Sequence, residues 1–188
     1  MIRGQTVSLR LFRDEAEISA CQALYNQLGE RPLTDHTELR SPQRYLADFR
    51  QDGLWGADRG TLLVTTRADE PVGLISFSRT TELELSVGYR LWRAVDRGKG
   101  YMSEALPLFS AYLFATIPNV TRLALLTATD NVASRRLAEK SGYVQEGVLR
   151  QACFYRGRLV DWVLYALLRD EAPRLEELLW TENGPASG

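Results

Sequence analysis

The stretch DRGKGYMSEA, from Asp96 to Ala105, decides how the middle of this chain folds. A strand-like run at 81–91 precedes it, a helical pattern at 102–116 follows, and residues 122–128 again have the composition of a short strand. A strand, a glycine-rich turn, a helix and a second strand form a βαβ unit, in which the two strands are parallel. Because open α/β sheets bind ligands at the carboxyl ends of their strands, the glycine turn is also the expected binding site.

Apolar periodicity along the rest of the chain predicts one α+β domain at 1–170 and an acidic helical extension with a flexible tail at 171–188. Further strands are expected at 7–11, 60–67 and 71–79, and two more within 144–168, joined at Arg156-Gly157. Helices are expected at 15–28, ending at Gly29, from Pro42 after a Ser41 cap, and from Asn131 to Ser141. The 7–11 strand should be half-buried, and 122–128, apolar on both faces, should be a central parallel strand.

Composition narrows the class of protein. The 188 residues hold 23 Lys and Arg against 24 Asp and Glu, and a net charge of -1 argues against nucleic acid as the main partner. The most apolar run, 13 residues from Ala105, is below the roughly 20 that span a bilayer, and the first residues lack the apolar stretch of a signal peptide. Two cysteines do not make a disulfide framework, which favours a reducing compartment. Together with the charge and the short apolar run, this predicts a cytoplasmic protein without membrane or nucleic-acid partners.

The glycine turn has the features of an anion site. It matches neither a dinucleotide fingerprint, since Ser103 stands where the third glycine would be, nor a phosphate-binding P-loop. A helix start can still bind an anion without these motifs, because its unpaired N–H groups attract negative charge. Basic residues that would suit a polyphosphate lie nearby: Arg90, Arg93, Arg97 and Lys99, with Arg135 and Arg136 on the next helix. A tight turn with solvated charges is the alternative interpretation.

A second constellation follows in the sequence. Asn131 and Ser134 open the next helix at the same end of the sheet. Arg97-x-x-Gly100-Tyr101-Met102 resembles the pyrophosphate motif of the GNAT superfamily of acetyl-CoA-dependent N-acetyltransferases, and Asn131-x-x-Ser134, Lys140-Ser141-Gly142-Tyr143 and Glu146-Gly147 resemble its next block. Over about 61–169 the chain is most similar to the RimJ/RimL-type branch, which acetylates N-terminal amines of ribosomal proteins. The resemblance implies a mixed, twisted sheet of about seven strands flanked by helices, with the cofactor at a central strand splay.

The resemblance also implies roles for single residues. Backbone N–H groups from Gly98 to Ser103 would hold the CoA pyrophosphate, and Ser134 would protonate the departing thiolate. The implied acetyl-CoA contacts are Leu91 and Trp92 at the splay, Arg97, Gly98, Lys99, Gly100, Tyr101, Met102, Ser103, Asn131 and Arg136. Helix capping is the alternative role for Asn131 and Ser134.

The chain departs from the family where a base is needed. Family members similar in this region carry a glutamate, proposed as general base, where this chain has Cys153. A thiol in apolar surroundings is a poor base near pH 7, so Cys153 is predicted to shape the acceptor pocket. Glu82, Glu84 and Asp161 are the candidate carboxylates, with a solvated strand face as the alternative, and Glu84 joins Ser134 and Cys153 in the expected catalytic set. No metal is required, and His36 is predicted to be incidental.

The acceptor stays open at this level. The resemblance places the 30–55 segment and the Arg156-Gly157 turn at the acceptor mouth, where Asp35, Glu38, Asp48 and Asp161 would favour a cationic amine. A protein N-terminus, an aminoglycoside-like antibiotic and a small amine all fit. A CoA-binding sensor without turnover is the rival function, favoured by the missing glutamate and opposed by Ser134, and a homodimer is left open.

Overall fold

The computed structural model describes residues 1–30, 39–155 and 157–181, and one mixed sheet of eight strands runs through it. The strands are β1 (Ile2–Arg3), β2 (Val7–Arg10), β3 (Arg59–Thr66), β4 (Pro71–Arg79), β5 (Glu84–Leu91), β6 (Arg122–Ala128), β7 (Val144–Tyr155) and β8 (Arg158–Leu168). Their order across the sheet is β1-β2-β3-β4-β5-β6-β8-β7. The mixed sheet of the expected fold is confirmed, and the two-residue β1 adds an eighth strand to the seven that the sequence predicts.

The predicted βαβ unit is present as β5, helix α3 (Tyr101–Thr116) and β6. Strands β5 and β6 are parallel, with Glu84 to Ser86 opposite Arg122 to Ala124. The other neighbour of β6 is β8, which pairs with it antiparallel from Arg122 to Ala128. The expectation of a strand between parallel neighbours was therefore wrong on one side. Its apolar character comes from burial on both faces of the sheet, whichever way the neighbouring strand runs.

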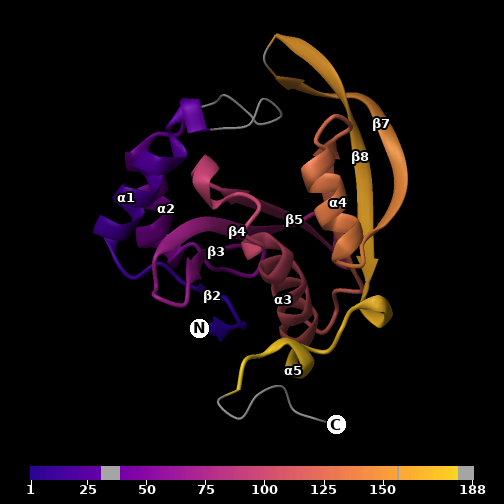
Figure 1. Ribbon diagram of the computed structural model, residues 1–188, viewed down its shortest axis with the longest axis horizontal. Coiled ribbons are helices and arrows are strands. Elements are labelled where there is room, and N and C mark those ends of the chain that lie inside the picture. The colour runs from indigo at the N-terminus through magenta and orange to yellow at the C-terminus, as the bar shows by residue number, and fades with distance from the viewer. Residues whose placement is uncertain (31–38, 156, 182–188) are drawn as a thin grey trace.

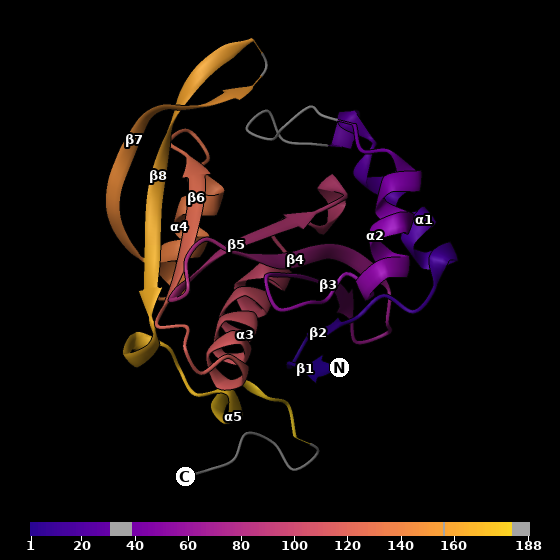
Figure 2. The same ribbon diagram turned by 180° about the vertical axis from the view of Figure 1, so that it is seen from behind.

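Helices cover both faces of the sheet (Figures 1 and 2). Helices α1 (Glu15–Tyr25) and α2 (Pro42–Asp52) pack on one face, and α3 and α4 (Val132–Lys140) on the other. Strand β3 shows how the sequence divides them, since Leu62 and Val64 join the cluster around α3 while Leu63 joins the cluster under α1 and α2. Alternate side chains of a strand point to opposite faces, so its continuous apolar run supplies both.

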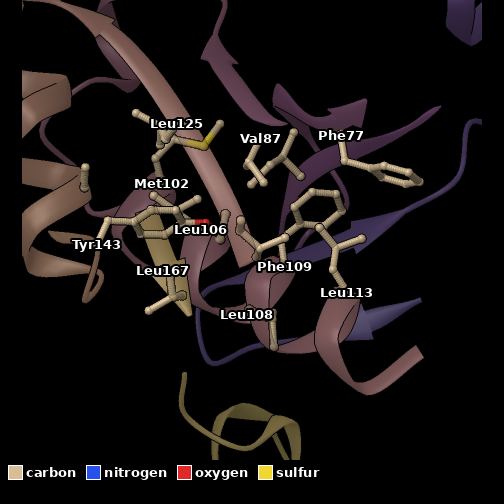
Figure 3. Close-up of a cluster of buried hydrophobic side chains, with 14 of the residues drawn as sticks. Phe77, Val87, Met102, Leu106, Leu108, Phe109, Leu113, Leu125, Tyr143 and Leu167 are labelled. Atoms are coloured by element: carbon tan, nitrogen blue, oxygen red, sulfur yellow. The ribbon is translucent and has the colours of Figure 1, made fainter. Parts of the chain in front are cut away.

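The larger core surrounds α3 (Figure 3). Nine of the 16 residues of α3 are buried, and the helix packs between the sheet, α4 and the C-terminal segment. Its buried Ser110 hydroxyl pairs with the Tyr143 hydroxyl at 2.8 Å, so neither polar group is left unsatisfied. At its C-terminal end, the Arg169 guanidinium donates to the Phe114 and Ile117 carbonyls at 2.6 and 2.7 Å. These contacts satisfy carbonyls that a helix end leaves without intrahelical partners.

Two local expectations differ from the structure. Strand β2 is buried at all four positions, because the Arg10 guanidinium is enclosed with Glu17 at 2.7 Å and Asp69 at 2.7 Å. The expected half-buried strand was therefore wrong, since ion pairing allows the polar face to be covered. Helix α1 ends at the Asn26 cap rather than at Gly29, and a 3-10 turn at Leu28–Glu30 follows it. Helix α2 begins at Pro42 after Ser41 as predicted, although the Ser41 side chain makes no capping bond.

The segment after β8 packs on the rest of the molecule. A 3-10 turn at Arg169–Glu171 leads to α5 (Leu175–Leu178), the predicted acidic helical stretch, and Leu175, Leu178 and Leu179 pack against the larger core. The Trp180 N–H then donates to the Arg3 carbonyl at 2.8 Å, which joins this segment to β1. Among the described helices, none has the length and apolarity to cross a membrane.

Candidate active site

The strands β5 and β6 separate in the middle of the sheet. They pair only from Glu84 to Ser86, whereas β5 stays paired with β4 up to Leu91 and β6 stays paired with β8 up to Ala128. The carboxyl halves of the two strands therefore diverge, as Figure 2 shows. In this gap the backbone N–H and carbonyl groups on the facing edges of β5 and β6 do not hydrogen-bond to one another.

One edge of the gap is the end of β5. The Trp92 N–H donates to the Val72 carbonyl of β4 at 3.1 Å, so this donor is already used within the sheet. Because N–H groups alternate sides along a strand, the Leu91 N–H points the other way, toward the gap. The Trp92 side chain is buried in the cluster under α1 and α2. Of the two expected backbone positions, only Leu91 offers an N–H to a molecule in the gap.

The glycine turn forms the start of α3. Gly98 and Gly100 have φ values of +75° and +84°, a left-handed conformation that side chains disfavour, and a Cβ added at either would meet no atom within 4 Å. Gly100 is the N-cap and makes no side-chain cap bond, and the first intrahelical bond runs from the Glu104 N–H to the Gly100 carbonyl. The N–H groups of Tyr101, Met102 and Ser103 therefore point out of the helix start, where an anion is favoured.

Buried Asp96 holds the shape of this turn. Its carboxylate, only 3% exposed, accepts from Arg93 Nε at 2.7 Å and lies 3.4 Å from Lys99 Nζ. Arg97 donates to the Glu30 carbonyl. Three of the basic residues that the sequence singles out, Arg93, Arg97 and Lys99, therefore hold the loop in place. Arg136 differs, since it lies exposed on α4.

The start of α4 lies against β5. Asn131 is the N-cap, and its side-chain oxygen accepts from the Ser134 N–H at 3.1 Å, so capping is observed for Asn131. The Ser134 hydroxyl does not cap the helix. It lies 2.7 Å from the Tyr89 hydroxyl, which joins the first turn of α4 to the diverging half of β5.

Tyr89 is the residue that the sequence analysis missed. Burial raises the pKa of its phenol to about 12, so the phenol stays protonated near neutral pH. It shares strand parity with Val87 and Leu91, which also face the α3 side of the sheet. Two sequence features together could have identified Tyr89. Its position has the same parity as the apolar residues Val87 and Leu91, and Ser134 is expected on the helix that covers the same face of the sheet.

Glu84 does not lie with these residues. It is at the opposite end of β5, five residues or roughly 16 Å along the strand from Tyr89, and its odd offset turns it to the other face. Burial favours a higher pKa for Glu84, but hydrogen bonds from Thr80 at 2.6 Å and Arg122 at 2.6 Å outweigh it and hold the pKa below its usual value. The structure therefore separates Glu84 from the expected catalytic set and makes it a weak base.

Cys153 lies beyond the end of β6. It is buried with Ala128 and Val160, with Trp162 packed against them, and burial raises the pKa of its thiol. Both cysteines of the chain are free. Nearby, Asp161 accepts from the Gln151 N–H at 2.8 Å, where β7 bulges and Gln151 has a φ of +51°. The cluster beyond the end of β6 is thus apolar, with one hydrogen-bonded carboxylate nearby.

The remaining sequence candidates are scattered. Glu82 is exposed in the turn before β5. Asp48, on α2, has its carboxylate 3.5 Å from the guanidinium of Arg59. Asp35, His36 and Glu38 lie outside the described residues. Within the described ranges, no group of three His, Cys, Asp or Glu side chains is arranged to hold a metal ion.

Comparison with known proteins identifies the family of this chain. Residues 7–144 match the model of the acetyltransferase (GNAT) domain. The chain is 29% identical over 142 residues to the uncharacterized N-acetyltransferase p20 of Bacillus licheniformis, covering 74% of this chain and 77% of that one. It is 32% identical over 106 residues to the ribosomal-protein-serine acetyltransferase of Escherichia coli, covering 55% and 58%.

A solved structure shares the fold. The spermidine N-acetyltransferase of Vibrio cholerae, in complex with CoA and spermine, superposes with a TM-score of 0.74 at 18% identity over 88% of this chain and 96% of that one. Since the family model covers most of the sequence, this chain belongs to the GNAT family of acetyltransferases. The prediction of an N-acetyltransferase is confirmed, and the rival interpretation as a sensor without turnover is not supported.

Proposed function

We propose that this protein transfers the acetyl group of acetyl-CoA to a primary amine by direct attack in a ternary complex. The observation that carries the proposal is the hydrogen bond between Tyr89 and Ser134, which places a hydroxyl pair beside the gap between β5 and β6. An acyl transfer needs a proton donor for the leaving thiolate, and binding alone gives no reason for one.

The glycine turn and the gap supply the binding surface in this proposal. The N–H groups from Gly98 to Ser103 hold the pyrophosphate, and the open space above Gly98 and Gly100 lets phosphate oxygens approach the backbone. Leu91 donates its N–H to the pantetheine arm in the gap. The Asn131 side chain already caps α4, so its amide group, rather than its bonded oxygen, is the part free to face that arm.

The chemistry then balances as follows. The neutral amine attacks the thioester carbonyl, a C–N bond forms, and the C–S bond breaks. The Ser134 hydroxyl gives its proton to the thiolate, while the Tyr89 phenol, protonated at neutral pH, donates to the Ser134 oxygen as negative charge develops there. The amine's proton passes to water, because neither Glu84 nor Cys153 is suited to accept it. Water then returns a proton to the Ser134 oxygen, so that overall one proton moves from the amine nitrogen to the thiol sulfur.

Two classes of acceptor fit the proposal. The Escherichia coli relative is a ribosomal-protein-serine acetyltransferase, which supports a protein N-terminal amine. The Vibrio cholerae neighbour is a spermidine N-acetyltransferase, which supports a small polyamine. The apolar cluster of Cys153, Val160 and Trp162 offers no carboxylate to the further ammonium groups of a polyamine, which favours a peptide N-terminus. We therefore put the peptide first.

The test is release of free CoA thiol from acetyl-CoA by the purified protein. The acceptor panel is a peptide with N-terminal serine, the same peptide with a blocked N-terminus, spermidine and an aminoglycoside. We expect release with the free peptide and none with the blocked one. Release with spermidine alone would support the acetyl transfer but identify a polyamine, not a peptide, as the acceptor. No release with any amine would contradict the proposed transfer.

A further inference from the structure

A cavity of about 350 Å³ lies on the β1–β3 side of the sheet, away from the acetyl-CoA gap. Its walls come from the N-terminal residues, β2, the end of β3, the β3–β4 turn and Trp180. None of its lining residues belongs to β5, β6, α3 or α4. In Figure 1 the strand β2, which contributes to this lining, lies near the N-terminal end, whereas α4 lies on the other side of the molecule. The volume is in the range of small-molecule sites.

The charges that line this cavity are unbalanced. Three arginines, Arg3, Arg13 and Arg67, face one carboxylate, Asp69. That carboxylate is already used, since it accepts from Arg10 Nε at 2.7 Å and from Arg13 at 2.5 Å. In the described part of the chain, no carboxylate oxygen lies within 4.0 Å of the side-chain nitrogens of Arg3 or Arg67. The lining thus has an excess of positive charge although the chain as a whole carries -1.

Trp180 contacts Arg67 through its ring and Arg3 through the backbone. The Arg67 guanidinium lies 4.4 Å from the centroid of the Trp180 ring and donates to the Gln5 carbonyl at 3.3 Å. The Trp180 N–H donates to the Arg3 carbonyl at 2.8 Å. Stacking therefore holds the Arg67 guanidinium in place, and the edges of a stacked guanidinium stay available for bidentate bonds. The exposed Arg3 guanidinium donates through Nε to the Met1 sulfur at 3.3 Å, which leaves its two terminal nitrogens for an anion.

We propose that this cavity binds a small polyanion carrying carboxylate or phosphate groups, at a site separate from acetyl-CoA. Two guanidinium groups can each bind two oxygens of such groups, and the Ser8 hydroxyl and the Trp180 ring supply a neutral polar and an apolar wall. A bound anion would link β1, the β3–β4 turn and the C-terminal segment, so it would stabilise the folded chain by binding it and not the unfolded one.

The experiment is isothermal calorimetry with citrate, and with inorganic phosphate in a second series, on the full chain. We expect one citrate per chain, and an affinity at least about tenfold weaker in the double variant Arg3→Gln, Arg67→Gln, because two charge-assisted contacts are lost. The matched control is Arg44→Gln, Arg150→Gln, which removes the same charge at exposed positions outside the cavity and should stay within about twofold.

Two further readings decide the site. Saturating CoA should leave citrate affinity unchanged, because the two sites share no residue. Displacement of citrate by CoA would place it in the glycine turn and overturn the proposal. So would equal citrate affinity in the two double variants, or no binding by the wild type. Binding of phosphate but not citrate would keep the site and restrict its ligand to phosphate. Circular dichroism confirms that each variant is folded.

Discussion

The hydrogen bond between Tyr89 and Ser134 gives the first prediction at the scale of single residues. Tyr89→Phe should lower kcat about tenfold with little change in the KM for acetyl-CoA, because the bond supports the proton donor and not the bound substrate. Ser134→Ala should lower kcat by about 100-fold. If Tyr89 acts through Ser134, the double variant should be no slower than Ser134→Ala alone.

The matched control is Tyr143→Phe, which removes another tyrosine–serine bond, to Ser110, in the core. It should reduce stability and leave kcat unchanged. Additive losses in the Tyr89 and Ser134 double variant would show that Tyr89 does not work through Ser134.

At this scale the sequence could supply residue types but not partners. Ser134 and Asn131 stand out by spacing within a few residues, and the structure places both at the start of α4 beside the gap. Tyr89 lies 45 residues away from Ser134 in sequence, so only the packing of α4 on β5 brings them together. Glu84 was chosen for its charge and apparent proximity, and its bond to Arg122 comes from strand pairing that the sequence does not encode locally.

The start of helix α3 gives the prediction at the scale of elements. Gly100→Val should lower acetyl-CoA affinity at least about tenfold, because the added side chain would fill the open space where the pyrophosphate is proposed to bind. It should also destabilise the fold by about 1–2 kcal/mol, since φ is +84°. Calorimetry and urea unfolding measure the two effects separately.

Gly53→Val separates strain from binding. Gly53, after α2, also has a positive φ of +65° and no atom within 4 Å of an added Cβ, and it lies outside the glycine turn. It should lose similar stability and keep its acetyl-CoA affinity within about twofold. Equal loss of affinity in both variants would remove the glycine turn from the cofactor site.

Most elements of this fold could be predicted because their signals are local. The hydrophobic periodicity and the two glycines predict the strand–turn–helix–strand order around Gly98 and Gly100, and the structure contains it. The end of α1 could not be predicted in the same way. The Asn26 N–H donates to the Gln22 and Leu24 carbonyls, and the helix ends there, three residues before Gly29. The full burial of β2 depends on Arg10 meeting Glu17 and Asp69, the second of them 59 residues away.

At the scale of the whole molecule, the first residues of the chain contact the segment that follows β8. Trp180 binds Arg3 through its backbone and Arg67 through its ring, and α5 packs on α3. Helix α3 therefore connects two regions: its first turn follows the glycine turn, and its far end contacts the C-terminal segment, partly through Arg169. Residues beyond 170 cover part of the larger core, since Leu175, Leu178 and Leu179 pack against it.

Deleting residues 173–188 should therefore destabilise the protein by roughly 2–4 kcal/mol, because partly buried Leu175, Leu178 and Leu179 leave the larger core. Urea unfolding measures the loss, and deletion of 182–188 alone is the control, expected to keep the stability of the full chain. The longer deletion also removes Trp180 and with it one wall of the cationic cavity, so citrate binding should disappear. The double variant of Arg3 and Arg67 should lose citrate binding without this loss of stability. Full stability after the longer deletion would show that the C-terminal segment only rests on the core.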